Sequence, residues 1–222
     1  MIKKHIEILR GENKSDLSKK ALELLSKSVD SKTLLLLSGG SSPKFLYQLI
    51  SKGEKLHPGA IALIDERFGI QMHENSNEKM IFETGLIDYI NNEGIPFFRI
   101  LTSGTIEEQA YRYEKVIAEL FKKFTRKVAI MGIGSDGHTA GIKPELNYDH
   151  KRLVVGYEDT NGSFGKRITL TFEVLSQINE FIILAFGENK KEALTKMFKE
   201  TDKQKNPAVF YVQTTAQVLL LN

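Results

Sequence analysis

The chain of 222 residues contains no cysteine. Disulfide bonds, thiolate metal ligands and a cysteine nucleophile are therefore excluded. No apolar run approaches the roughly 20 residues that cross a bilayer, so we expect no contact with a membrane. Charged residues interrupt the apolar stretch of Met1–Arg10, which is unlike a secretory signal. These absences together predict a cytoplasmic protein.

Neither sign of charge dominates the sequence. Lysine and arginine number 31 and acidic residues 28, which gives a formal net charge of +3. Two lysine-rich stretches, 121–127 and 196–205, alternate with apolar residues, which is typical of solvated helix faces. We expect no nucleic-acid partner, and the sequence does not indicate an oligomeric state. The length and an apolar share of 41% suit a single domain over residues 1–222.

Strand-like and helix-like segments alternate along the chain. Helical spacing of apolar residues predicts helices over 15–29, 45–50, 105–124 and 188–199. Short apolar runs predict strands over 5–10, 33–37, 60–64, 127–131, 152–157, 167–171 and 181–186. Nearly continuous apolar strands separated by helices favour an α/β fold, in which helices cover both faces of a mainly parallel sheet.

One segment, Val128–Ala140, combines an apolar strand with three glycines, an aspartate and a histidine. The Gly-x-Gly-x-x-Gly spacing of residues 132–137 matches a dinucleotide-binding fingerprint, which requires a helix to begin at the glycines. Gly141 and Pro144 would interrupt such a helix, so we expect no nicotinamide or flavin cofactor. His138 instead lies where a strand of an α/β sheet opens onto a crevice, a suitable place for proton transfer.

A second glycine-containing turn, Leu37–Pro43, joins a predicted strand to a predicted helix. Pro43 suits the first helical position, which makes Ser42 the expected N-cap. Gly39 and Gly40 would let a ligand approach the backbone, and the helix start offers free N–H groups to a phosphate. The alternative is a tight turn with an ordinary N-cap. The Gly-Lys-Ser/Thr ending of a Walker loop is absent.

Charged residues lie at further ends of predicted strands. Asp65–Arg67 directly follows the strand 60–64, either as part of a site or as an ion pair near the surface. Arg167 begins a strand and Lys190 lies in a strand-to-helix turn; arginine grips phosphate as a fork and lysine acts as a point charge. These residues and the two glycine turns predict a crevice for a phosphorylated ligand. No histidine spacing suggests a metal site.

In this order, the elements resemble the 6-phosphogluconolactonase family. The matching strings are Ser-Gly-Gly-Ser-Ser-Pro at 38–43, Asp-Glu-Arg at 65–67 with Asn-Ser-Asn at 75–77, Gly-Ile-Gly-Ser-Asp-Gly-His-Thr-Ala at 132–140, and Arg-Ile-Thr-Leu-Thr at 167–171 with Gly-x-x-Lys at 187–190. Related glucosamine-6-phosphate deaminases usually show Asp-Glu-Tyr, and they follow the histidine with Ile-Ala-Phe-Asn-Glu-Pro. This chain has Asp-Glu-Arg and Thr-Ala-Gly-Ile-Lys-Pro. Both differences favour the lactonase.

The resemblance implies a Rossmann-like fold of the deaminase and ribose-phosphate isomerase type that binds no dinucleotide. It also implies hydrolysis of 6-phospho-D-glucono-1,5-lactone to 6-phosphogluconate in the oxidative pentose phosphate pathway, without a metal or other cofactor. Two alternatives stay open. One is a glucosamine-6-phosphate deaminase/isomerase with Asp65 as the carbon base, and the other is a non-catalytic sugar-phosphate sensor.

The resemblance also assigns roles to individual residues. His138 is the general base that takes a proton from the attacking water. Asp136 either orients the imidazole or hydrogen-bonds its own turn. Arg67 stabilises the developing oxyanion or contacts substrate hydroxyls, and Asp65 completes the expected catalytic set. The substrate phosphate is expected on Gly39, Gly40, Ser41, Arg167 and Lys190.

The chain departs from its apparent family in three places, one of which is the loop 66–73, where the proline often found after Asp-Glu-Arg is missing. Gly141–Glu145 stands where lactonases commonly have Ser-Leu-Phe-Pro-Gly, and the C-terminus lacks the usual tryptophan and aspartate. Lys143, within Gly141–Glu145, is either a solvated side chain or a cation close to His138. A positive charge close to the imidazole would lower the pKa of His138.

Overall fold

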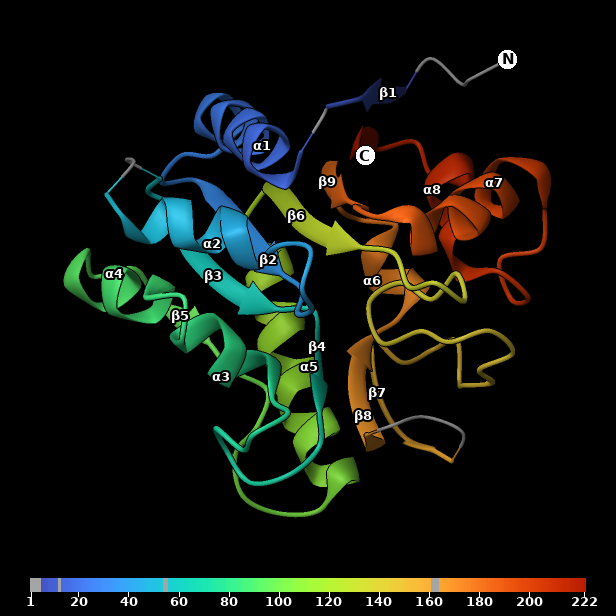
Figure 1. Ribbon diagram of the computed structural model, residues 1–222. Coiled ribbons are helices and arrows are strands. Elements are labelled where there is room, and N and C mark those ends of the chain that lie inside the picture. The colour runs from blue at the N-terminus through green and yellow to red at the C-terminus, as the bar shows by residue number, and fades with distance from the viewer. Residues whose placement is uncertain (1–4, 12, 54–55, 161–163) are drawn as a thin grey trace.

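In the part of the chain that the structure describes, seven parallel strands form the central sheet (Figure 1). The computed structural model describes residues 5–11, 13–53, 56–160 and 164–222. Across the sheet lie β1 (Ile6–Leu9), β10 (Gln217–Leu221), β9 (Glu180–Leu184), β6 (Arg126–Gly132), β2 (Thr33–Leu37), β3 (Ala60–Leu63) and β5 (Phe97–Phe98). Every neighbouring pair is parallel, which confirms the predicted sheet.

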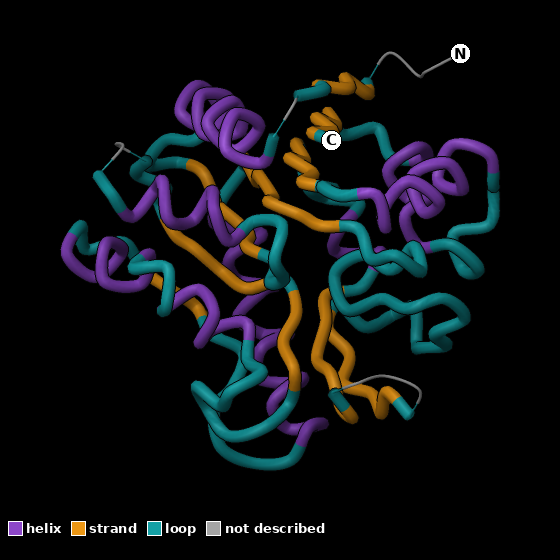
Figure 2. Tube along the Cα trace, in the orientation of Figure 1, coloured by secondary structure: helices purple, strands orange, loops and turns teal. Residues whose placement is uncertain are grey.

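Helices cover both faces of this sheet (Figures 1 and 2). They are α1 (Lys14–Ser28), α2 (Lys44–Ser51), α3 (Asn77–Phe82), α4 (Leu86–Asn92), α5 (Ile106–Lys123), α6 (Phe172–Leu175), α7 (Lys191–Lys199) and α8 (Phe210–Gln213), with 3₁₀ turns at Glu188–Lys190 and Pro207–Val209. In α5, Thr105 and Glu108 cap each other's backbone N–H groups, which fixes its start close to the predicted residue. The central strands are buried on both faces, as the leucine run of β2 illustrates.

A second, smaller sheet lies at one edge of the cavity described below. It consists of β4 (Asp65–Arg67), β8 (Gly165–Leu170) and β7 (Val154–Asp159), all antiparallel. The strands predicted at 152–157 and 167–171 therefore pair with each other and not with the main sheet. The physical reason is the short connection between them, because parallel neighbours need a long crossover whereas antiparallel ones do not.

The chain order places a crevice beside β2 and β6. These two strands are parallel neighbours, with Leu37 opposite Ile130 near their carboxyl ends. After β2 the chain moves outward to β3, whereas after β6 it moves in the opposite direction to β9. Ligands of open α/β sheets bind at such a reversal of strand order. Both glycine turns singled out in the sequence begin at this point.

Several elements were not predicted from the sequence. They are β4, β5, β10, α3, α4, α6 and α8. The run Val218–Leu221 is an inner strand between β1 and β9, and nothing local distinguishes it from other short apolar runs. No helix in the described part of the chain is long and apolar enough to cross a membrane. The cytoplasmic location and the single domain over 1–222 stay predictions.

Candidate active site

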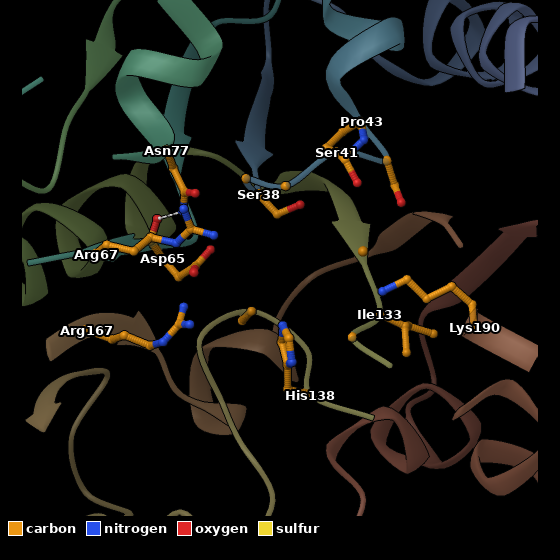
Figure 3. Close-up of a pocket in the computed structure, with 16 residues that line it drawn as sticks. Ser38, Ser41, Pro43, Asp65, Arg67, Asn77, Ile133, His138, Arg167 and Lys190 are labelled. Atoms are coloured by element: carbon orange, nitrogen blue, oxygen red, sulfur yellow. Dashed lines mark hydrogen bonds between the residues drawn. The ribbon is translucent and has the colours of Figure 1, made fainter. Parts of the chain in front are cut away.

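A cavity of about 220 Å³ opens where the strand order reverses (Figure 3). Most of the predicted site residues line it: Gly39, Gly40, Ser41, Asp65, Arg67, His138, Arg167 and Lys190. Asp136, the remaining one, is hydrogen-bonded to His138. Figure 3 shows the two arginines on one side of the open space and Lys190 on the other. The fold thus brings the predicted residues together from separate segments of the chain.

His138 and Asp136 form a hydrogen-bonded pair. His138 Nδ1 lies 2.6 Å from Asp136 Oδ1, and the backbone N–H of His138 donates to the same oxygen at 3.1 Å. A carboxylate can only accept, so Nδ1 carries the ring proton and Nε2 of the neutral imidazole is unprotonated. The bond from His138 holds the pKa of Asp136 well below its usual range. Asp136 therefore orients the imidazole and also closes its own turn.

Gly134, the second glycine of the Gly-x-Gly-x-x-Gly spacing, makes room for this pair. A Cβ on Gly134 would lie 2.1 Å from His138 Nδ1 and 2.5 Å from Asp136 Oδ1. Such contacts are impossible without displacing the pair, so only glycine leaves room for it. Residues 134–144 contain no helix, as the sequence predicts. Gly134 thus allows close approach of the histidine, and Gly137 allows close approach of Asn206.

The turn after β2 differs in one detail from its prediction. Ser42 is not the N-cap: α2 begins at Lys44, Pro43 occupies the cap position, and no side chain caps the first turn. The first N–H groups of α2 are thus left without a side-chain partner. Gly40 adopts a φ of +96°, which favours glycine, and Gly39 lies so close to the Asn77 amide that a Cβ would overlap it.

Asp65–Arg67 was predicted to be either part of a site or an ion pair near the surface. Among the described residues, these three side chains form no ion pair with one another. Glu66 is fully buried, and its carboxylate accepts backbone N–H bonds from Arg67 (2.7 Å), Asn77 (2.6 Å) and Glu78 (2.9 Å). It thereby fastens the start of α3 to β4. Arg67 Nη1 donates to the carbonyl oxygen of Asn75 at 2.7 Å, which places the guanidinium on the wall of the cavity.

Burial raises the pKa of Glu66 to about 7, although the three N–H groups favour its ionised form. A carboxyl whose pKa is higher in the folded state stabilises the fold below its unfolded pKa of 4.5, and this contribution is lost as the pH rises through about 7. The contribution is on the order of 3 kcal/mol.

We therefore expect the free energy of unfolding of the wild type to fall between pH 4.5 and 7.5, and Glu66→Gln to lack this part of the decrease. Urea unfolding of both proteins at several pH values measures the difference. Identical slopes in the two proteins would show that Glu66 does not titrate in this range.

Opposite charges surround Arg167. Its Nε donates to Asp159 Oδ2 at 2.8 Å. Burial works against its charge, but the bond to Asp159 and the nearby Asp65 raise the pKa of Arg167 above its ordinary value. Burial lowers the pKa of Lys190. The ammonium of Lys143 donates to Asp159, so this side chain is not simply solvated. No hydrogen bond between Lys143 and His138 is found among the described residues.

Sequence reasoning gave no role to some residues that build the site. Asn77 lines the cavity, and its Nδ2 donates to the carbonyl oxygen of Asp65 at 2.8 Å (Figure 3). Ser38 lines it as well. The strings at 75–77 and 38–43 were the available signals, but which of their side chains face the cavity depends on how α3 and β2 are placed.

Comparison with known proteins shows the family of the chain. Residues 11–220 match the family described as glucosamine-6-phosphate isomerases/6-phosphogluconolactonase. The chain belongs to this family. A 6-phosphogluconolactonase of Helicobacter pylori is 31% identical over 73% of this chain and 71% of its own length. One of Nostoc sp. is 29% identical over 89% and 86%. The crystal structure of 6-phosphogluconolactonase from Thermotoga maritima has a TM-score of 0.79 at 25% identity and covers 97% of both chains.

Proposed function

We propose that this family member hydrolyses 6-phospho-D-glucono-1,5-lactone to 6-phosphogluconate, in the cytoplasm and as a step of the oxidative pentose phosphate pathway. The observation that carries the proposal is the orientation of His138, whose Nε2 is free to accept a proton in a cavity lined by Arg67, Arg167 and Lys190. Hydrolysis of an anionic lactone needs both features, namely a base for water and cations for the phosphate and the oxyanion.

The reaction begins with a water held by His138. Nε2 takes a proton from this water as its oxygen attacks the C1 carbonyl, and Arg67 stabilises the negative charge that develops on the carbonyl oxygen. The bond between C1 and the ring oxygen then breaks, and the imidazolium returns the proton to that ring oxygen. Asp136 stabilises the imidazolium in between. The product is a carboxylic acid, which ionises at neutral pH.

Substrate binding is assigned to the remaining residues. Arg167, Lys190 and the backbone of Gly39–Ser41 hold the phosphate, which does not react. Anchoring this remote group positions C1 against the base, so its binding energy contributes to the rate. Asp65 stays in the catalytic set, because it lines the cavity and its carboxylate helps to raise the pKa of Arg167.

A deaminase acting on glucosamine 6-phosphate is less well supported by the residues around the histidine. The deaminase string places a glutamate five residues after the histidine, whereas this chain has Lys143 there. That lysine is bonded to Asp159. The chain therefore has a cation at the sequence position where the deaminase string has a carboxylate.

Proton release tests the function, since each turnover converts an uncharged ester into an ionised carboxylate. The lactone is generated freshly, and the rate of its spontaneous hydrolysis is subtracted. We expect proton release proportional to protein concentration and no ammonia from glucosamine 6-phosphate. Ammonia release would support the deaminase instead. Binding of 6-phosphogluconate without turnover of either substrate would support a sensor.

Arg167→Ala and Lys190→Ala are expected to weaken binding of both substrate and product. Each removes a charge-assisted hydrogen bond worth about 1.5–3 kcal/mol, so KM and the inhibition constant of 6-phosphogluconate should rise at least about tenfold. Turnover at saturating lactone should change much less. Product inhibition measured in the same assay checks this. Unaltered inhibition in both variants would place the phosphate elsewhere.

A further inference from the structure

Lys143 belongs to a three-membered charge cluster that reaches the cavity through Arg167, the one member that lines it. Its Nζ lies 2.7 Å from Asp159 Oδ1, and the other oxygen of Asp159 accepts from Arg167 Nε at 2.8 Å. The side chain of Lys143 is 24% exposed and that of Asp159 only 3%. One buried carboxylate is thus shared by two cations, and the cluster has a net charge of +1.

This sharing determines how much positive charge Arg167 offers to a ligand. Arg167 uses Nε for Asp159, and Figure 3 shows the outer end of its guanidinium directed into the open space. Without Lys143, Asp159 would neutralise Arg167 alone, and both its oxygens would be free to bind the guanidinium as a fork. With Lys143, only one oxygen faces Arg167, and one positive charge is left over.

Neighbouring residues keep Arg167 in place from other sides. Arg67 and Arg167 are directly opposite each other in the β4–β8 pair. Like charges at such positions repel, and so they need a counter-charge nearby. Both guanidinium groups also lie over the ring of Phe164, at 4.4 Å and 5.3 Å from its centre. The wall therefore needs Asp159 for stability, but too strong a bond to Asp159 would withdraw Arg167 from the ligand.

We propose that Lys143 is a positioning and specificity-determining residue, which occupies one oxygen of Asp159 so that Arg167 keeps its charge for the phosphate of the substrate. This inference rests on the proposed function, since it assumes that Arg167 contacts the phosphate. It concerns the recognition of phosphorylated ligands and not the proton transfer at His138. Lys143 itself does not line the cavity.

The experiment measures 6-phosphogluconate binding by titration calorimetry for the wild type, Lys143→Met, Lys143→Gln and Lys143→Arg. Loss of one unit charge near the phosphate should weaken binding about tenfold in the Met and Gln variants. The Arg variant should bind within about twofold of the wild type. The affinity for gluconate, which lacks the phosphate, should be the same in all four proteins. In the lactonase assay, KM should rise in the Met variant while kcat stays within about twofold.

Lys166→Met is the matched control. Lys166 pairs with Glu158 on strands β8 and β7, which also carry Arg167 and Asp159. Both side chains of the pair are exposed, and neither lines the cavity. Removal of Lys166 changes the net charge equally and should not alter binding. Equal effects of Lys143→Met and Lys166→Met, wild-type affinity in Lys143→Gln, or an equal loss of gluconate binding would each overturn the inference. Failure of the wild type to bind 6-phosphogluconate would instead reject the proposed function.

Discussion

His138→Ala is expected to lower kcat by about 10²–10⁴-fold, with little change in stability or in the binding of 6-phosphogluconate. The range is the usual contribution of a positioned general base. Nε2 is the unprotonated nitrogen because Nδ1 is bonded to Asp136, so Nε2 is the ring atom that can take the proton. The side chain of His138 is 36% exposed, so its removal costs little packing. Turnover is measured by proton release, and stability by thermal unfolding.

Asp136→Asn is the companion variant for this prediction. The asparagine carbonyl can still accept from Nδ1, but it no longer stabilises the imidazolium by charge, so kcat should fall less than in His138→Ala. Product binding should be the same in both variants, because neither side chain is assigned to the phosphate. Activity of His138→Ala within a few-fold of the wild type would remove His138 from the role of base.

Gly134→Ala is expected to lower kcat by about 10²-fold while the protein remains folded. The added Cβ would lie 2.1 Å from His138 Nδ1, which forces the imidazole out of its bond with Asp136. A displacement of about 1 Å in a catalytic group can cost this factor. Gly134 does not have a positive φ, so alanine introduces no backbone strain that would unfold the turn. The effect should therefore fall on kcat more than on stability.

Gly132→Ala provides the comparison within the same glycine spacing. A Cβ there would meet only the carbonyl oxygen of Leu184 at 3.9 Å, an ordinary contact. The proton NMR signal of the His138 Nδ1–H, broadened or shifted in Gly134→Ala, should stay unchanged in this variant, and the loss of turnover should be far smaller. Equal losses in the two variants would contradict the steric explanation.

Local patterns were sufficient to predict most of the main sheet and its longest helices. The strands at 33–37 and 60–64 are continuous apolar runs because both of their faces are covered. The helix predicted at 105–124 was found at Ile106–Lys123, since its apolar spacing and its capping residues are both local. Strand β10 was missed because its inner place in the sheet comes from pairing with β9 and β1, which no short segment specifies.

The roles of individual side chains depended more on the tertiary structure. Glu66 could not be separated from Asp65 and Arg67 by sequence, yet it is the one of the three that is fully buried, and its carboxylate accepts two backbone N–H groups at the start of α3. The sequence left two interpretations of Lys143, a solvated side chain or a neighbour of His138, and neither of them included Asp159. Sixteen positions separate Lys143 from Asp159 in the sequence, and only the folding of β7 against the loop after His138 brings them together.

The sequence by itself determined the α/β class, the loops that contribute to the cavity and the residue types that they carry. These depend on apolar periodicity and on glycine, both of which act over a few residues. The tertiary structure decided which nitrogen of His138 is free, which oxygen of Asp159 faces Arg167, and that Gly134 makes room for the His138–Asp136 pair. Each of these depends on contacts a few ångströms long, between atoms whose approach is fixed only once the sheet and its loops have packed.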